Sequence, residues 1–138
     1  MDNGKLKEYY LTHDYNCAET MLRLFNEEYQ LGLGGDALVL AGGFGGGMGC
    51  GETCGALCGA LMVLSRLLVE GRAHGTPGFR DACGEYVRRF EAEFGSIRCA
   101  QLKAEHFCAG GTRCLAVVER GARLLEAYLN ALPSKEER

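Results

Sequence analysis

Cysteine is the residue type whose number and spacing in this sequence point most directly to chemistry. The 138 residues contain eight cysteines, namely Cys17, Cys50, Cys54, Cys58, Cys83, Cys99, Cys108 and Cys114. Thiolates are the nucleophiles of disulfide exchange and the ligands of Fe–S clusters and zinc. The cysteine density is below that of a disulfide-rich secreted module, and the N-terminal segment has no apolar signal region. We therefore expect a cytoplasmic protein whose cysteines are redox-active thiols, metal ligands or buried side chains.

Three of these cysteines fall at predicted helix starts. Each follows a capping residue: Cys17 follows Asn16, Cys54 follows Thr53, and Cys114 lies in the first turn behind Thr112. A helix N-terminus carries unpaired N–H donors and about half a positive charge, which lower the pKa of a thiol from its free value of about 8.5. We therefore expect stabilised thiolates at all three positions.

The roles of the other cysteines differ with their surroundings. Cys50 and Cys58 flank Cys54 at a spacing of four residues, so each remains open as an auxiliary ligand, a resolving thiol or a packing residue. Cys83 shares an apolar helical stripe with aromatic side chains, which predicts a core position. Cys99 and Cys108 lie in a less regular region, and each is a candidate to approach the same centre as Cys114.

Motif spacing excludes several familiar cysteine devices. The sequence contains no C-x-x-C, so a thioredoxin-type dithiol and a paired zinc ribbon are unsupported, and no C-x-x-C-H, so covalent haem attachment is excluded. His13 and His106 lie near cysteines and remain open as a ligand, a base or solvated residues, whereas His74 is expected at the surface. Motifs alone leave a metal centre and two thiol pairs as equal alternatives.

A glycine run precedes Cys54. In Gly42–Gly51, seven of ten residues are glycine, but the run lacks the G-x-G-x-x-G and G-K-[ST] patterns of nucleotide loops. We expect Gly49, Gly51 and Gly55 to bring backbone N–H groups close to a thiolate or a bound cofactor. Gly55 and Gly59 each cost about 1 kcal/mol within a helix relative to alanine. Close helix packing or a prosthetic group would justify that cost.

The elements that position these residues are predicted to be helices. Apolar residues recur at helical spacing in 5–13, 16–29, 36–40, 53–71, 76–95, a short turn after Ser96, and 112–129. An irregular connection is expected near Glu105–Gly111, and a polar tail follows Pro133. No segment alternates as a strand would. The sequence therefore predicts one all-α domain over residues 1–138, a bundle of four to five main helices with a glycine-rich loop before the central helix.

Charge and composition limit the partners. Apolar residues make up 47% of the chain, enough for a core, and the net charge of −3 comes from interspersed charged residues. Neither a basic nucleic-acid footprint nor a polybasic membrane patch is present, and the apolar stretch Ala56–Val69 is too short to span a bilayer. We expect no nucleic-acid partner and no membrane insertion. The predicted partner is a redox protein of unspecified identity, and a homodimer remains an open alternative.

The segment Gly49–Gly59 resembles the redox-active family named for its C…GCAxxG…C…C pattern. Supporting pieces are Asn16–Glu19 upstream, the glycine run, Phe94–Cys99 downstream and a cysteine at the head of the last helix. By this resemblance Cys17, Cys54, Cys99 and Cys114 correspond to the family's four cysteines, and Cys108 competes for the fourth place. The resemblance implies a small helical protein with a redox or metal-cluster role. A related domain occurs in split-Soret cytochromes, which carry haem and an iron–sulfur centre.

Two main hypotheses follow. In the first, Cys17, Cys54, Cys99 and Cys114 converge in an electron-transfer protein, either as thiol/disulfide pairs or as ligands of an Fe–S cluster, with Cys108 as a further candidate ligand. In the second, the protein is a non-catalytic partner-binding module, stabilised by zinc or purely by packing. A weaker third alternative is an enzyme with a single thiolate nucleophile.

Overall fold

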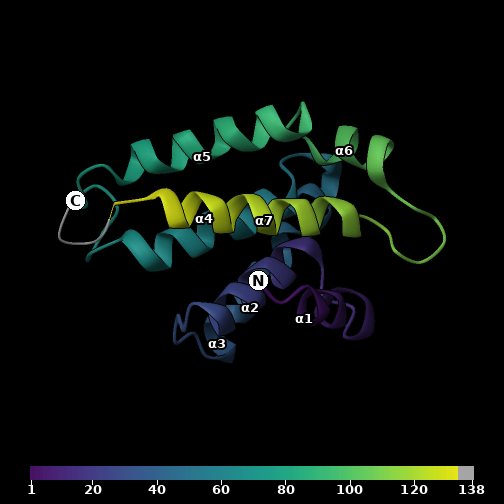
Figure 1. Ribbon diagram of the computed structural model, residues 1–138, viewed down its shortest axis with the longest axis horizontal. Helices are drawn as coiled ribbons and strands as arrows, with labels where there is room; N and C mark the ends of the chain where they lie inside the picture. Colours follow the sequence, from purple (N-terminus) through teal and green to yellow (C-terminus); the bar gives the residue numbers. More distant parts are fainter. Residues whose placement is uncertain (134–138) are drawn as a thin grey trace.

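Four long helices form the body of the molecule in the computed structural model, which describes residues 1–133. They are α2 (Cys17–Glu28), α4 (Gly55–Leu68), α5 (Phe79–Phe94) and α7 (Leu115–Ala131). Helices α5 and α7 run along the long axis of the molecule, and α4 contacts all three of the other long helices (Figure 1). Helix α4 is thus the central helix, as the sequence predicts.

Short helical elements connect and flank this body. They are α1 (Asn3–Lys7), the π-helical turn η1 (Glu8–Thr12), α3 (Gly35–Leu38), the 3-10 turn η2 (Val39–Phe44), the glycine-rich turn η3 (Gly47–Gly51) and α6 (Cys99–His106). Residues 1–133 contain no strand, only two isolated bridges, Thr53 with Arg98 and Cys108 with Arg113. The prediction of an all-α fold is therefore confirmed, although the described residues form four long helices and three short ones in place of four to five main helices. The predicted tail beyond Pro133 lies outside the described residues.

The core is built around α4. Its buried side chains, Leu57, Val63 and Leu64 among them, pack in one cluster with buried residues of the other long helices. These partners include Phe25 of α2, Tyr86 and Phe90 of α5, and Leu125 of α7. Burial of each such side chain contributes roughly 1.5–3 kcal/mol, so the apolar stripes account for the helix packing. Over residues 1–133, no helix is both long enough and apolar enough to cross a lipid bilayer.

Helix boundaries follow local hydrogen bonds. Asn16 and Glu19 form the predicted reciprocal capping box at the start of α2, and Gly95 ends α5 with φ of 81°. The sequence predicts Pro77 as the first residue of α5, and this prediction is wrong. Gly78 precedes the helix and Phe79 begins it. The reason is that the Thr76 hydroxyl accepts from the N–H of Glu70 and donates to the carbonyl of Arg72, both at 2.9 Å. These bonds hold a turn that delays the helix.

Candidate functional site

Helices α2 and α4 approach each other at a notch made by glycine. A Cβ atom on Gly55 would lie 2.2 Å from Sγ of Cys17, and one on Gly59 would lie 2.8 Å from the carbonyl oxygen of Ala18. Neither position has room for a side chain. The Cys17 sulfur therefore rests on the backbone of the first turn of α4, immediately beside Cys54, and this contact explains the glycines within the helix.

A backbone bridge brings Cys54 and Cys99 to the same end of the bundle. The N–H of Cys54 donates to the carbonyl of Ile97 at 2.8 Å, and the N–H of Cys99 donates to the carbonyl of Glu52 at 2.5 Å. Cys54 is the N-cap of α4 and is 5% exposed, whereas Cys99 is the half-buried first residue of α6. Two cysteines 45 residues apart in sequence thus lie on paired segments.

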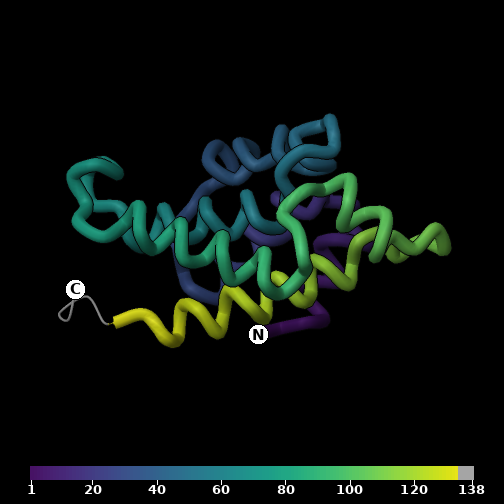
Figure 2. Tube along the Cα trace, turned by 90° about the horizontal axis from the view of Figure 1, so that it is seen from above, coloured from purple at the N-terminus to yellow at the C-terminus, as the bar shows by residue number. Residues whose placement is uncertain are grey.

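The glycine-rich turn covers this pair. Gly46, Gly47, Met48 and Gly49 have consecutive φ values of 62°, 64°, 60° and 74°, which is left-handed backbone that glycine adopts without steric cost. A Cβ on Gly47 would lie 2.5 Å from the Cβ of Cys99. The turn, which lies beside α6 in Figure 2, therefore packs directly over Cys99.

A pinned connection places the last cysteine of the site. Cys108 and Arg113 exchange backbone hydrogen bonds of 2.9 and 3.1 Å, which closes the loop before α7. The Arg113 guanidinium pairs with the carboxylate of Asp14 at 2.8 Å and donates to the carbonyl of Tyr10. Cys114, the N-cap of α7, donates its N–H to the Tyr10 hydroxyl oxygen at 3.2 Å.

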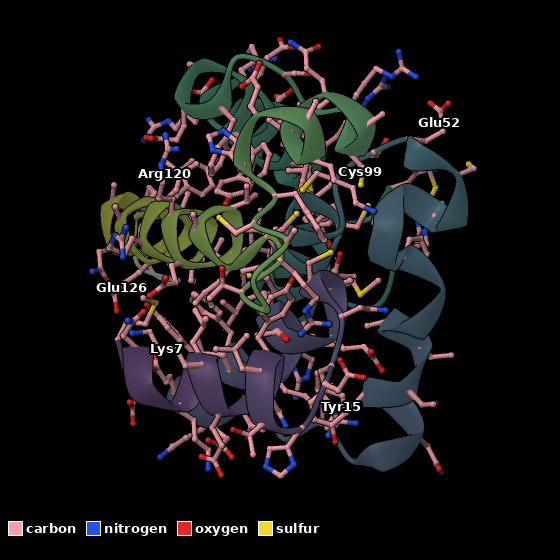
Figure 3. All side chains as sticks on the ribbon, turned by 90° about the vertical axis from the view of Figure 1, so that its right-hand side faces the viewer. Lys7, Tyr15, Glu52, Cys99, Arg120 and Glu126 are labelled. Carbon is pink, nitrogen blue, oxygen red and sulfur yellow. The ribbon has the colours of Figure 1, made fainter. Side chains whose placement is uncertain are left out.

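Cys17, Cys54, Cys99 and Cys114 form what we call the cysteine cluster. Charge on Cys17 or Cys99 raises the pKa of both Cys54 and Cys114, and charge on Cys99 raises that of Cys17, so these groups lie within electrostatic reach of one another. Sulfur atoms gather near the labelled Cys99 in Figure 3. The four cysteines that the sequence resemblance indicated thus act electrostatically on one another.

Burial dominates the electrostatics of the cluster. It raises the pKa of Cys17 and Cys114, and with the nearby thiol of Cys17 it raises the pKa of Cys54 to about 12. Backbone N–H groups do lower the pKa of Cys17, from Gly46 and Ala18, and that of Cys54, from Ala56 and Leu57. Their effect is smaller than desolvation. The predicted stabilisation of thiolates at Cys17, Cys54 and Cys114 is therefore wrong.

The helix starts also differ in register from the predicted ones. Cys17 is the first residue of its helix, as predicted, but Cys54 and Cys114 are N-caps instead of first-turn residues. Ser96 does not cap α6: its hydroxyl accepts the N–H of Arg98 at 3.0 Å, and the helix begins at Cys99. An N-cap residue donates no intrahelical hydrogen bond, so the N–H groups of Cys54 and Cys114 are free to bind Ile97 and Tyr10.

The remaining cysteines lie outside the cluster or at its edge. Cys58 lies one turn after Cys54 and is half-buried. Burial is the larger cause of its raised pKa, and charge on Cys17 is the smaller cause. Cys50 is exposed, and Cys108 is exposed with its Sγ 3.8 Å from the carbonyl of His106. Cys83, predicted in the core, is only half-buried on α5. Of the two competitors for the fourth place, Cys114 interacts electrostatically with Cys17 and Cys99, and Cys108 is exposed.

The predicted glycines and histidines have different surroundings. Gly55 touches the cluster, but a Cβ on Gly49 would meet nothing within 4 Å and one on Gly51 would meet Ala100. His13 is exposed and lies 3.4 Å from Glu8, and His106 lies edge-on to the ring of Phe94. Tyr10, which contacts Cys114, was missed because a tyrosine on an apolar helical stripe carries no motif.

The arrangement bears on metal binding. Four cysteines are a suitable donor set for an Fe–S cluster or zinc. In the described part of the chain, however, no three His, Cys, Asp or Glu side chains are placed to hold one metal ion. The side chains as arranged do not fit such a group, and all eight cysteines are free thiols. Ligation of iron–sulfur or zinc by Cys17, Cys54, Cys99, Cys108 and Cys114 stays a prediction.

Comparison with known proteins identifies one family. Residues 15–128 match the family described as "Putative redox-active protein (C_GCAxxG_C_C)". The matched segment contains the whole cysteine cluster and begins after Tyr10. No curated protein and no solved structure matches the chain.

Proposed function

The chain belongs to the C_GCAxxG_C_C family, and from this membership we propose that its cysteine cluster is a thiol/disulfide redox centre. The observation that carries the proposal is the seat of Cys17 on the backbone of Gly55, beside Cys54. Cys17 also interacts electrostatically with every other member of the cluster. It is therefore the thiol best placed to exchange partners.

Cys17 and Cys54 differ in burial, and we assign them different roles in the exchange. Cys17 is partly exposed as a residue, whereas Cys54 is 5% exposed. We assign Cys17 as the attacking thiol and Cys54 as the resolving thiol. Cys99 and Cys114 then form the second pair of the cluster.

The proposed reaction is disulfide exchange with an oxidant that is itself a disulfide. The Cys17 thiolate attacks one sulfur of the oxidant, a mixed disulfide forms, and the first oxidant sulfur leaves as a thiolate that takes a proton. Cys54 then attacks Cys17, and the second oxidant sulfur leaves. Two thiols of the protein are oxidised to one disulfide, and one disulfide is reduced to two thiols. No metal takes part in this step.

The raised thiol pKa values predict the direction of the potential. A low pKa stabilises the reduced form of a dithiol and makes its disulfide a strong oxidant. Burial does the opposite here, because it disfavours the thiolates of Cys17 and Cys54. We expect a reducing centre, nearer to the value of about −270 mV of thioredoxin than to the value of about −120 mV of DsbA.

The test is disulfide mapping in glutathione buffers of stepped potential. The full chain, prepared without oxygen, is equilibrated, alkylated and digested without reductant, and the disulfide-linked peptides are identified by mass spectrometry. We expect a Cys17–Cys54 linkage that follows a two-electron transition. Cys17→Ser abolishes it, whereas Cys108→Ser, which removes an exposed thiol outside the cluster, leaves it intact.

Two results would overturn the proposal. One is a wild-type protein that remains fully reduced in oxidising buffer while its thiols are accessible under denaturing conditions. The other is stoichiometric iron with acid-labile sulfide, or stoichiometric zinc, lost on mutation of Cys17. The second result would support the metal hypotheses instead.

A further inference from the structure

Tyr10 lies at the edge of the cysteine cluster, on an element outside the matched family segment. It is 5% exposed and sits in the π-helical turn η1, a type of distortion found frequently at functional sites. Its hydroxyl oxygen accepts the N–H of Cys114 at 3.2 Å. Charge on Cys114 and on Cys17 also acts on Tyr10. The hydroxyl therefore lies directly beside Cys114, a member of the cysteine cluster.

The hydroxyl proton of Tyr10 is available. The oxygen accepts the N–H of Cys114, and this bond does not use the hydroxyl's own proton. Arg113 makes two contacts with Tyr10. Its guanidinium lies 4.3 Å from the centroid of the ring and also donates to the Tyr10 carbonyl. Burial raises the pKa of Tyr10 to about 12, so the hydroxyl stays protonated at neutral pH. Tyr10 is thus a fixed hydrogen-bond donor beside the sulfurs.

A donor at this position meets a need of the proposed chemistry. Disulfide exchange passes through thiolates, and burial disfavours thiolates throughout the cluster. The side chains of His13 and His106 pair with Glu8 and Glu105. At Cys17, backbone N–H groups of Gly46 and Ala18 supply part of the stabilisation. The Tyr10 hydroxyl is a side-chain donor next to Cys114.

We infer that Tyr10 donates its hydroxyl proton in a hydrogen bond to the thiolate that forms at Cys114 when the Cys99–Cys114 pair undergoes disulfide exchange. This inference rests on the proposed thiol/disulfide function. Hydrogen bonds to a charged sulfur are stronger than those to a neutral thiol or disulfide, so the contact favours the transition state of exchange over both resting states. Tyr10 therefore accelerates opening of the cluster disulfide.

The experiment compares two tyrosine variants. Tyr10→Phe removes the donor. The control, Tyr128→Phe, removes the hydroxyl of a tyrosine near the end of α7 that is similarly buried, at 4% exposed. That hydroxyl donates to the carbonyl of Ala82 at 2.7 Å. The oxidised full chain is mixed with excess dithiothreitol, and the rate of appearance of free Cys114 thiol is followed. We expect a roughly tenfold slower reduction in Tyr10→Phe, the loss that corresponds to about 1.4 kcal/mol of transition-state stabilisation. Tyr128→Phe should reduce at the wild-type rate.

Equal rates for Tyr10→Phe and the wild type would overturn the inference, as would equal slowing by both variants. If Tyr10→Phe does not fold, the wild-type protein labelled with ¹³C-tyrosine still tests it. The ring carbon that bears the Tyr10 hydroxyl should shift between the reduced and disulfide forms, and that of Tyr128 should not. Failure of the redox function itself is distinguishable, because the wild type would then form no cluster disulfide to reduce.

Discussion

The two halves of the cysteine cluster are held in place by different forces. Cys17 and Cys54 lie where α2 packs against α4, and their positions follow from close contact through Gly55 and Gly59. Cys114 lies beyond the connection between α6 and α7, which reaches one end of the molecule in Figures 1 and 2. Its position follows from polar contacts of Arg113 and Tyr10.

This difference bears on how each half responds to change. A close-packed contact has no spare volume, so one added methyl group is felt through both helices. A pinned loop depends on a few hydrogen bonds and one ion pair that face solvent, each of modest net value. We therefore expect the α2–α4 half to be rigid and costly to disturb, and the loop half to loosen at small cost.

The largest expected effect is that of Gly55→Ala. The added Cβ would lie 2.2 Å from Sγ of Cys17 and 2.8 Å from the carbonyl oxygen of Phe44, so α2 and the glycine-rich segment must move away from α4. We expect a loss of about 3 kcal/mol in the free energy of unfolding, measured with urea, at the upper end of ordinary overpacking. Formation of the Cys17–Cys54 disulfide should fall with it.

Gly84→Ala is the matched control on α5. A Cβ there would meet only the end of the flexible Arg88 side chain, at 3.4 Å. Because alanine favours a helix over glycine, this variant should gain about 0.5–1 kcal/mol. A Gly55→Ala protein as stable as the wild type would contradict the close-packed contact.

The sequence predicted the rigid half well. Asn16 and Glu19 specify the start of α2 through a capping box, and the apolar stripe of α4 specifies its packing, since both signals are local. The cost of Gly55 and Gly59 within a helix also pointed correctly to a close approach. What the sequence could not supply was burial: desolvation depends on every neighbour in space, and it reversed the predicted direction of the pKa of Cys17, Cys54 and Cys114.

The loop half was harder to predict for a related reason. Cys108 and Cys114 are six residues apart, and both follow residues compatible with a turn. The choice between them depends on the Arg113 contacts to Tyr10 and Asp14, about one hundred positions away in sequence. Such long-range polar contacts leave no periodic or motif signal in a single sequence.

The second effect, which tests the buried half, is the loss of stability in alkali. The pKa of Cys54 in the folded protein is about 12, above the free thiol value of about 8.5. Well below pH 8.5 both the folded and the unfolded forms hold this proton, so Cys54 contributes no pH dependence there. Above pH 9 the unfolded form releases it and the folded form keeps it, so the free energy of unfolding falls by about 1.4 kcal/mol per pH unit for this group.

Cys54→Ala isolates that contribution. Urea unfolding of the reduced proteins between pH 7 and about 10.5 should give parallel curves below pH 8, which serve as the internal control. Above pH 9 the wild-type slope should be the steeper of the two. Cys54→Ala still shows some slope from Cys17 and Cys114, because burial raises their pKa values as well. Identical slopes in alkali would mean that Cys54 is not desolvated.

The smallest expected effect concerns the pinned loop. Arg113→Ala removes the ion pair with Asp14, the hydrogen bond to the Tyr10 carbonyl and the cation over the Tyr10 ring. The Asp14 side chain is largely exposed, so we expect a loss of only about 1 kcal/mol in the free energy of unfolding. Alkylation of Cys114 in the native protein should nevertheless become several times faster, because the loop opens more often.

Arg88→Ala separates this role from the loss of any surface ion pair. Arg88 pairs with Glu85 at 3.1 Å, but its side chain is 70% exposed and lies far along α5 from the loop. It should change stability by less than about 0.5 kcal/mol and leave the alkylation rate of Cys114 unchanged. If Arg113→Ala instead cost as much as Gly55→Ala, the loop would be as tightly constrained as the helix contact. The two halves of the cluster would then move as one unit, and Cys114 would be as firmly fixed for exchange as Cys17.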